Sequence, residues 1–298
     1  MPSATVYKPS QKVGRFPWAI PAIGVAAAVI LGILAAAFTG NITFSMKLQI
    51  LVWAGAGAGI GAIVAGIGTA LKCRNRALIL ISAVAALAVG LHTAYAYLAT
   101  SYLSQVGVPV PLTTIIFDPT APYNVLEGLA QSGVFIKNNK PMGSGALWFE
   151  WGFAGVMFAG CGIAAAWAVS AGRVFCEPCN VWVPVEPGMR FKTPDEAGLA
   201  LLKQGDLSPL VRQREAGETS AAIEAPYIRV DYSICKACGN TGVYKLFNVT
   251  ADKKGEESAK ALGPMYVIDE NSIVHIGVLT SKEPAPASAA AAEAPPAA

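Results

Sequence analysis

Charged residues are scarce in this chain of 298 residues. Lys, Arg, Asp and Glu together make up 14% of it, whereas hydrophobic residues make up 54% and the mean hydropathy is +0.48. Soluble domains carry about 25% charged residues, so the composition favours an integral membrane protein. The net charge of +3 is too small to indicate a polyanionic partner such as a nucleic acid.

Motifs for the common enzyme chemistries are also missing. The sequence has no phosphate-binding loop, no dinucleotide-binding fingerprint, no nucleophile elbow and no carboxylate dyad. Its two histidines, His92 and His275, belong to no His, Asp and Glu triad that would make a catalytic metal site. The sequence therefore gives no positive indication of an enzyme.

The sequence contains four long apolar runs with almost no charged residues. A transmembrane helix needs about 20 mostly apolar residues, and four stretches qualify: Trp18–Phe38, Leu48–Leu71, Ala77–Ala99 and a run from about Ala146 to Ala171. The first is longer than the apolar core of a signal peptide, which spans about 7–15 residues, so we expect it to be retained. The pattern predicts a domain of four transmembrane helices over residues 17–171, with an extracytoplasmic loop over residues 100–145.

Basic residues are distributed unevenly among the segments between the spans. One side of the predicted topology carries seven of them: Lys8, Lys12, Arg15, Lys72, Arg74, Arg76 and Arg173. On the other side, the first loop has only Lys47, and the two lysines of the long loop are balanced by two acidic residues. Because cytoplasmic loops are enriched in Lys and Arg, we expect a multi-pass protein of the inner membrane with both termini, including an arm of residues 1–16, in the cytoplasm.

The second span is rich in glycine at helical spacing. Gly55 and Gly59, and likewise Gly57 and Gly61, stand four residues apart, and small residues at this spacing let helices approach closely in lipid. We expect this face to pack against the first or third span of the same chain. A homo-oligomer formed through the second helix is the alternative.

Two ionisable side chains lie within the predicted spans, where charge is costly. His92 belongs to the third span and Glu150 begins the fourth, so both fall toward the outer leaflet and can form an intramembrane polar pair. Such a pair would suit a small transporter or sensor. In the simpler interpretation Glu150 reaches the membrane interface beside two tryptophans, and His92 bonds to residues of its own helix.

Four of the six cysteines form two Cys-x-x-Cys pairs, Cys176 with Cys179 and Cys235 with Cys238. Four thiolates in two such pairs make the ligand set of a tetrahedral zinc site. Because four protein ligands leave no open position, the predicted zinc is structural. Iron in the same site and unmetallated redox thiols are the alternatives.

Strand and helix signals surround the cysteines. Expected strands are Val181–Val183, Tyr227–Val230 and Val243–Val249, followed by a closing hairpin of Met265–Ile268 with Ile273–Leu279. A helix is expected over Thr193–Leu202, with Thr193 as its cap. These elements define a small domain of residues 172–282, and the Ala/Pro-rich tail of residues 283–298 is expected to be disordered.

The motifs Cys176-Glu177-Pro178-Cys179 and Cys235-Lys236-Ala237-Cys238-Gly239 resemble the knuckles of zinc-ribbon and rubredoxin-type folds. About 55 residues separate the two pairs, against roughly 15–20 in the compact pattern, so an insert must loop out between them. The expected fold is thus a membrane all-α part with four transmembrane helices plus a small cytoplasmic α+β domain that is zinc-ribbon-like.

The predicted domain has nearly balanced charge. Residues 173–282 contain 13 basic and 14 acidic residues, which lacks the footprint of a nucleic-acid-binding domain. We therefore expect its partners to be the lipid bilayer and another protein. The sequence favours an adaptor or accessory subunit that displays a structural-zinc domain, with a membrane-bound thiol redox or electron-transfer protein as the alternative.

Overall fold

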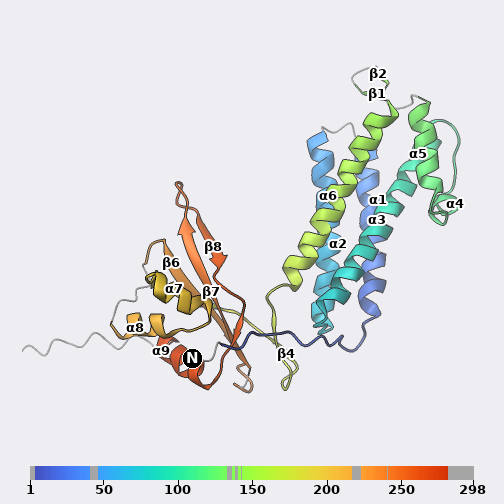
Figure 1. Ribbon diagram of the computed structural model, residues 1–298. Helices are drawn as coiled ribbons and strands as arrows, with labels where there is room; N and C mark the ends of the chain where they lie inside the picture. The colour runs from blue at the N-terminus through green and yellow to red at the C-terminus, as the bar shows by residue number, and fades with distance from the viewer. Residues whose placement is uncertain are drawn as a thin grey trace, which may run out of the picture. The chain divides into compact units, whose positions relative to one another are not determined.

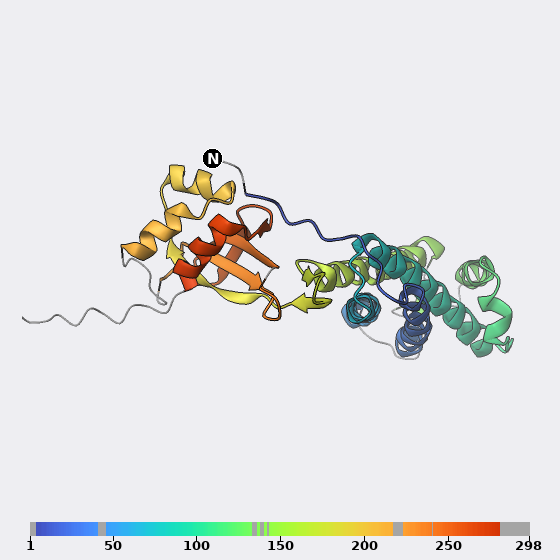
Figure 2. The same cartoon turned by 90° about the horizontal axis from the view of Figure 1, so that it is seen from below.

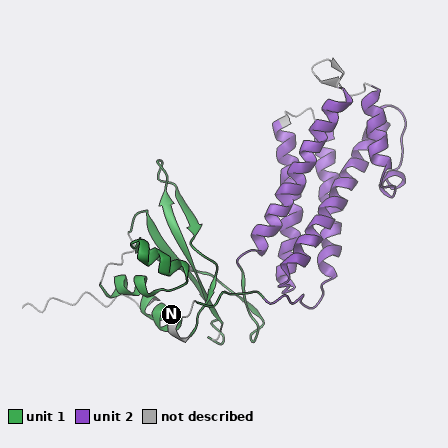
Figure 3. Cartoon of the chain, in the orientation of Figure 1, with its two compact units in different colours: residues 1–9, 173–298 green, residues 10–172 purple. Residues whose placement is uncertain are grey.

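The computed structural model describes residues 4–40, 46–132, 136–137, 140–141, 143–216, 223–239 and 241–280 (Figure 1). The chain divides into two compact units (Figure 3). One contains residues 10–172, and the other contains residues 1–9 together with residues 173–298. Each unit has a hydrophobic core of its own.

The unit of residues 10–172 is a helical bundle with a small cap. Its elements are α1 (Ala19–Gly40), α2 (Met46–Ala70), α3 (Arg76–Gln105), α4 (Leu112–Ile116), α5 (Ala121–Gln131), β1 (Ile136–Lys137), β2 (Lys140–Pro141) and α6 (Ser144–Ser170). The helices α1, α2, α3 and α6 are long and apolar enough to cross a membrane. The four predicted spans are confirmed as helices, and α3 continues past the predicted end at Ala99 to Gln105.

Glycine lets two of these helices come into close contact. A Cβ placed on Gly57 would lie 1.9 Å from the carbonyl oxygen of Phe158, and one on Gly61 would lie 1.9 Å from that of Gly162. The glycine face therefore packs within the chain, as predicted, but against α6. At Gly66 a Cβ would meet no described atom within 4 Å, so part of the small-residue surface of α2 remains open.

The outer surface of the bundle is apolar. Ile30, Leu51, Ile81 and Val156 each expose 60% or more of their area, which is the surface expected of helices whose solvent is lipid. Inside, Trp53 packs against Tyr95 and Phe158, with ring centroids 6.2 and 5.9 Å apart. Composition and burial together support a membrane protein.

The cap follows α3. Within the predicted loop, helix α5 begins at Ala121 with a proline in its first turn. The Asp118 carboxylate accepts hydrogen bonds from the backbone N–H groups of Thr120 and Ala121 and so holds the start of α5. Residues 133–135, 138–139 and 142 of the predicted loop lie outside the described residues.

The second unit is α+β. Its elements are β3 (Val174–Cys176), β4 (Val181–Val183), β5 (Glu186–Lys192), α7 (Glu196–Lys203), α8 (Ser208–Glu215), β6 (Tyr227–Ile234), β7 (Gly242–Ala251), β8 (Glu257–Ala261), β9 (Tyr266–Val267) and α9 (Glu270–Thr280). An antiparallel sheet has the order β5-β6-β7-β8, with β9 also paired to β7. The helices α7, α8 and α9 pack on one face of this sheet through a shared apolar core (Figure 2).

Two sequence predictions in this unit are wrong. The segment Ile273–Leu279 is part of helix α9, not the second strand of a hairpin, because Ile276 and Leu279 fall on one helical face and are buried. His275 is accordingly on a helix. Helix α7 begins later than expected: Asp195, whose carboxylate accepts the N–H of Gly198 at 2.8 Å, caps it in place of Thr193.

The first described residues of the chain belong to this unit as well. The Val267 N–H donates to the carbonyl of Thr5, and the Tyr7 N–H donates to that of Met265, both at 2.8 Å. The Tyr7 hydroxyl accepts the N–H of Phe175 at 3.2 Å. The N-terminal segment thus runs along β9 like a short added strand. The sequence did not predict this pairing, because residues 1–9 contain no local strand pattern.

Candidate metal centre

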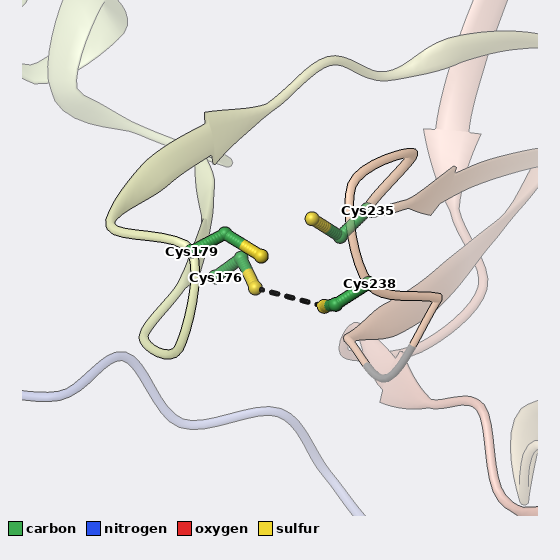
Figure 4. A group of neighbouring side chains, drawn as sticks. All are labelled: Cys176, Cys179, Cys235 and Cys238. Atoms are coloured by element: carbon green, nitrogen blue, oxygen red, sulfur yellow. Dashed lines mark hydrogen bonds between the residues drawn. The ribbon is translucent and has the colours of Figure 1, made fainter.

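Two tight turns carry the four cysteines. The first joins β3 to β4, in which Cys176 pairs with Val181, and it contains Asn180 at a φ of 54°. The second follows β6, and there the Gly239 N–H donates to the carbonyl of Cys235 at 2.8 Å. Gly239 has a φ of 69°, which a residue without a Cβ adopts readily. Each turn places its two thiols on the side that faces the other turn (Figure 4).

The four sulfur atoms form one cluster. The Sγ atoms of Cys176, Cys179, Cys235 and Cys238 all lie within 4.8 Å of one another. Zn–S bonds of about 2.3 Å in a tetrahedron place sulfurs about 3.8 Å apart. The Cys176 and Cys238 sulfurs, which belong to different motifs, are 3.5 Å apart. The sequence-predicted ligand set is therefore brought together, and it can hold a metal ion.

An apolar shell surrounds the cluster. Cys176 and Cys235 are buried, whereas Cys179 and Cys238 are half-buried. The buried valines Val174, Val183 and Val243 complete this core. Tyr7 and Met265 also pack against it. The N-terminal segment therefore contributes directly to the wall of the site.

One hydroxyl acts on the thiols. Thr241 donates its O–H to the Cys176 sulfur at 3.3 Å, and this hydrogen bond is the largest of several that together lower the pKa of Cys176 to about 6. Hydrogen bonding to Cys238, together with burial, raises the pKa of Cys179 to about 12. The protein groups alone thus favour ionisation of one thiol and oppose it at another. A bound cation would allow all four to ionise, because thiolates are the form that binds metal.

The donor set defines the chemistry of the site. Four sulfur ligands suit a soft or borderline-soft ion and leave no position for substrate or water. Among the residues that the structure describes, this is the one group of three or more His, Cys, Asp or Glu side chains placed to share a metal ion. A cysteine-based, closed metal centre is what these residues can form.

His92 and Glu150, the predicted intramembrane pair, each contact other residues of the bundle and its cap. His92 Nε2 lies 2.9 Å from the carbonyl oxygen of Ile116 in α4, and the His92 ring packs 6.2 Å from that of Tyr123. Glu150 is half-buried in α6, near enough to Tyr102 to interact electrostatically. His92 therefore bonds to the cap, not to its own helix. Its pairing with Glu150 stays a prediction.

No protein-family model, no curated protein and no solved structure matches this chain. A function must accordingly be inferred from the geometry of the described residues.

Proposed function

We propose that this chain is a four-span inner-membrane protein that displays a cytoplasmic structural-zinc domain, and that it acts as an adaptor or accessory subunit through contacts of that domain with another protein. The observation that carries the proposal is the sulfur cluster, in which four Sγ atoms from two turns lie within 4.8 Å of one another. A closed tetrathiolate site builds structure and leaves no room for a reacting group.

The position of the cluster in the fold supports a structural role. Among the strands that the structure describes, the β3–β4 hairpin forms a sheet separate from the larger one that contains β6 and β7. One cysteine pair belongs to each, so a metal ion would join them. In small domains with little core, metal binding supplies folding free energy directly. The zinc-ribbon resemblance belongs to this proposal.

The N-terminal segment supports the proposed topology. Residues 5–7 pair beside β9, which follows the last span in sequence. Since they share one folded unit, the two flanks of the bundle belong on the same side of a membrane, as an even number of spans requires. The excess of Lys and Arg on these flanks favours the cytoplasm as that side.

The proposal is tested by removing single sulfurs from the full chain. We expect one zinc per chain in the wild type and in a Cys161→Ser control, whose sulfur is not in the cluster. Cys176→Ser and Cys235→Ser are expected to lose the zinc, and hydrogen exchange should rise across β6 and β7 while α2 and α6 stay protected. A variant that kept both its zinc and its protection would show that the tetrad is not the metal site.

A thiol redox or electron-transfer role is the second candidate, favoured by the partial exposure of Cys179 and Cys238. Against it, both motifs lie in turns between strands, not at the start of a helix that would lower a thiol pKa. Purified protein distinguishes the two roles. Iron, or metal-free thiols that oxidise reversibly in pairs, would replace the structural-zinc proposal.

The transporter or sensor hypothesis is tested separately. It requires His92→Ala and Glu150→Gln to alter transport or response while the metal content is unchanged. Wild-type behaviour of both variants would end that hypothesis and leave the adaptor proposal untouched.

A further inference from the structure

The segment between α3 and α5 is apolar, although it lies outside the four candidate spans. From Val106 to Phe117 it contains no charged residue, and its polar side chains are those of Thr113 and Thr114. Val106, Val108 and Phe117 are exposed, and Phe117, at 85%, exposes the largest fraction of any described large hydrophobic side chain. An exposed apolar surface of this kind indicates a partner that is itself apolar.

This segment returns along the side of α3 (Figure 1). Helix α3 ends at Gln105, but the carbonyl oxygen of Ile116 lies 2.9 Å from Nε2 of His92. At the rise of an α-helix, His92 lies about 20 Å before the end of α3. Tyr123, near the start of α5, packs at the same level, with its ring 6.2 Å from that of His92. Helix α4 therefore lies beside the candidate span and not beyond its end.

Aromatic residues of α6 indicate the level of the membrane surface at this end of the bundle. The rings of Trp148 and Trp151 pack with centroids 5.3 Å apart, and tryptophans near the end of a span favour the membrane–water interface. The Tyr95 hydroxyl donates to the carbonyl oxygen of Trp151 at 2.9 Å, so Tyr95 lies at the same level. His92 lies about 5 Å further into the span. Its contact with α4 brings Phe117 to the boundary between headgroups and acyl chains.

The backbone of the returning segment suits a place with little water. The N–H groups of Val106, Gly107 and Val108 donate to carbonyl oxygens in the last turns of α3, the third of them at 2.9 Å. Pro109 and Pro111 have no N–H group. These five residues therefore present no backbone donor that needs water, which is required where lipid replaces it.

We propose that the segment from Val106 to Phe117, including α4, lies in the membrane interface, with Phe117 inserted among the acyl chains of the adjacent leaflet. Asp118 limits the depth of insertion, because its exposed carboxylate belongs in the headgroup layer. The segment thereby anchors the cap to the bilayer, as interfacial apolar segments do. This inference is independent of the cysteine cluster, of the adaptor role and of which side of the membrane the cap occupies.

The first test measures the access of water to Phe117 in the wild-type full chain. The chain is placed in phosphatidylcholine nanodiscs, one molecule in each, so that no second copy can cover the segment. Hydroxyl radicals oxidise exposed side chains, and mass spectrometry compares the rate at each residue with that in its free proteolytic peptide. Burial of a phenylalanine in apolar surroundings shifts an equilibrium by about ten-fold or more, so Phe117 should be protected by about that factor. Val185, 52% exposed in the other unit, should react at nearly its peptide rate.

Variants test whether Phe117 is the anchor. Phe117→Glu places a charge where lipid is expected, and it should raise the oxidation of Val108, on the same segment, to nearly the peptide rate. Phe117→Leu keeps an apolar side chain and should leave Val108 protected. A photoreactive p-benzoylphenylalanine in place of Phe117 should form cross-links to phospholipid, which identifies what covers the position.

Three outcomes would overturn the proposal. The first is oxidation of Phe117 in the wild type at nearly its peptide rate, a result that needs no variant to fold. The second is equal protection of Val108 in Phe117→Glu and Phe117→Leu when both have the helix content of the wild type. The third is cross-linking from position 117 to other parts of the chain and none to lipid, which would mean that protein covers this surface.

Discussion

At the scale of single residues, Thr241 acts on the candidate metal centre through a hydrogen bond to one of its four sulfurs. Its hydroxyl donates to the Cys176 sulfur and is the largest cause of the lowered pKa of that thiol. The side chain of Val has nearly the same shape but no donor, so Thr241→Val isolates the hydrogen bond. Partners of metal ligands are worth about 10–100-fold in metal affinity. We expect Thr241→Val to weaken metal binding by about ten-fold, measured by competition with a chelator.

The matched control is Thr250→Val, on the same strand β7 but exposed and away from the cysteines. It should leave metal affinity unchanged. If the two variants behaved alike, the hydroxyl of Thr241 would have no part in holding the metal.

At the scale of elements, the contact between α2 and α6 depends on glycine. Gly57→Ala places a Cβ 1.9 Å from the backbone oxygen of Phe158, which can move only if the helices separate. Overpacking of this kind costs about 1–3 kcal/mol, so we expect a lower thermal unfolding midpoint in detergent. Gly66→Ala adds the same methyl group where no described atom lies within 4 Å. It should be neutral, and equal midpoints for the two variants would contradict the observed packing.

The cap is joined to α6 through Glu127. Its carboxylate accepts hydrogen bonds from the indole N–H of Trp148, the amide of Gln131 and the hydroxyl of Ser144. The bond from Trp148 is the largest cause of a lowered pKa at Glu127. A carboxyl whose pKa falls on folding stabilises the fold above its unfolded pKa, and that stability is lost as the pH drops through the folded value. We therefore expect α5 to loosen below about pH 4, detected as faster hydrogen exchange over residues 121–131.

Glu127→Gln supplies the control for this pH dependence. The amide does not titrate, so α5 should loosen less steeply with acid in the variant than in the wild type. Identical pH profiles would assign the effect to another group, such as Asp118, whose pKa is also lowered, chiefly by the Thr120 N–H.

An element could be predicted from the sequence where neighbouring residues determine it, and could not where contacts with distant residues do. The four spans follow from uninterrupted apolar composition, and the cysteine cluster follows from spacing within each motif. Helix α9 could not be read this way, because its β-branched Ile273 and Val274 favour a strand, whereas burial of Ile276 and Leu279 decides for a helix. Strand β8 is exposed throughout and exists only through its pairing with β7.

At the scale of the whole molecule, the described residues before Ser10 and those after Gly172 belong to the same folded unit. Tyr7 packs on the core around the cysteine cluster and accepts a hydrogen bond from the Phe175 N–H. We expect Tyr7→Ala in the full chain to destabilise the α+β unit by about 1–3 kcal/mol. Urea unfolding followed by hydrogen exchange over β6 and β7 would measure the loss.

The neighbouring exposed residue gives the comparison. Lys8→Ala removes a side chain of similar length from the same segment and should leave the unit unchanged. If Tyr7→Ala also had no effect, the N-terminal segment would pair with β9 without stabilising the unit.

The pairing of residues 5–7 with β9 also limits when the α+β unit can fold during translation. Residues 5–7 are translated before the four candidate spans, but their partner strand is translated only after all four of them. Until then the N-terminal segment has nothing to pair with, and the wall of the cysteine cluster to which Tyr7 contributes is incomplete. The α+β unit can therefore be completed only after the four helices have been translated, and a chain truncated before Tyr266 would lack the strand with which residues 5–7 pair.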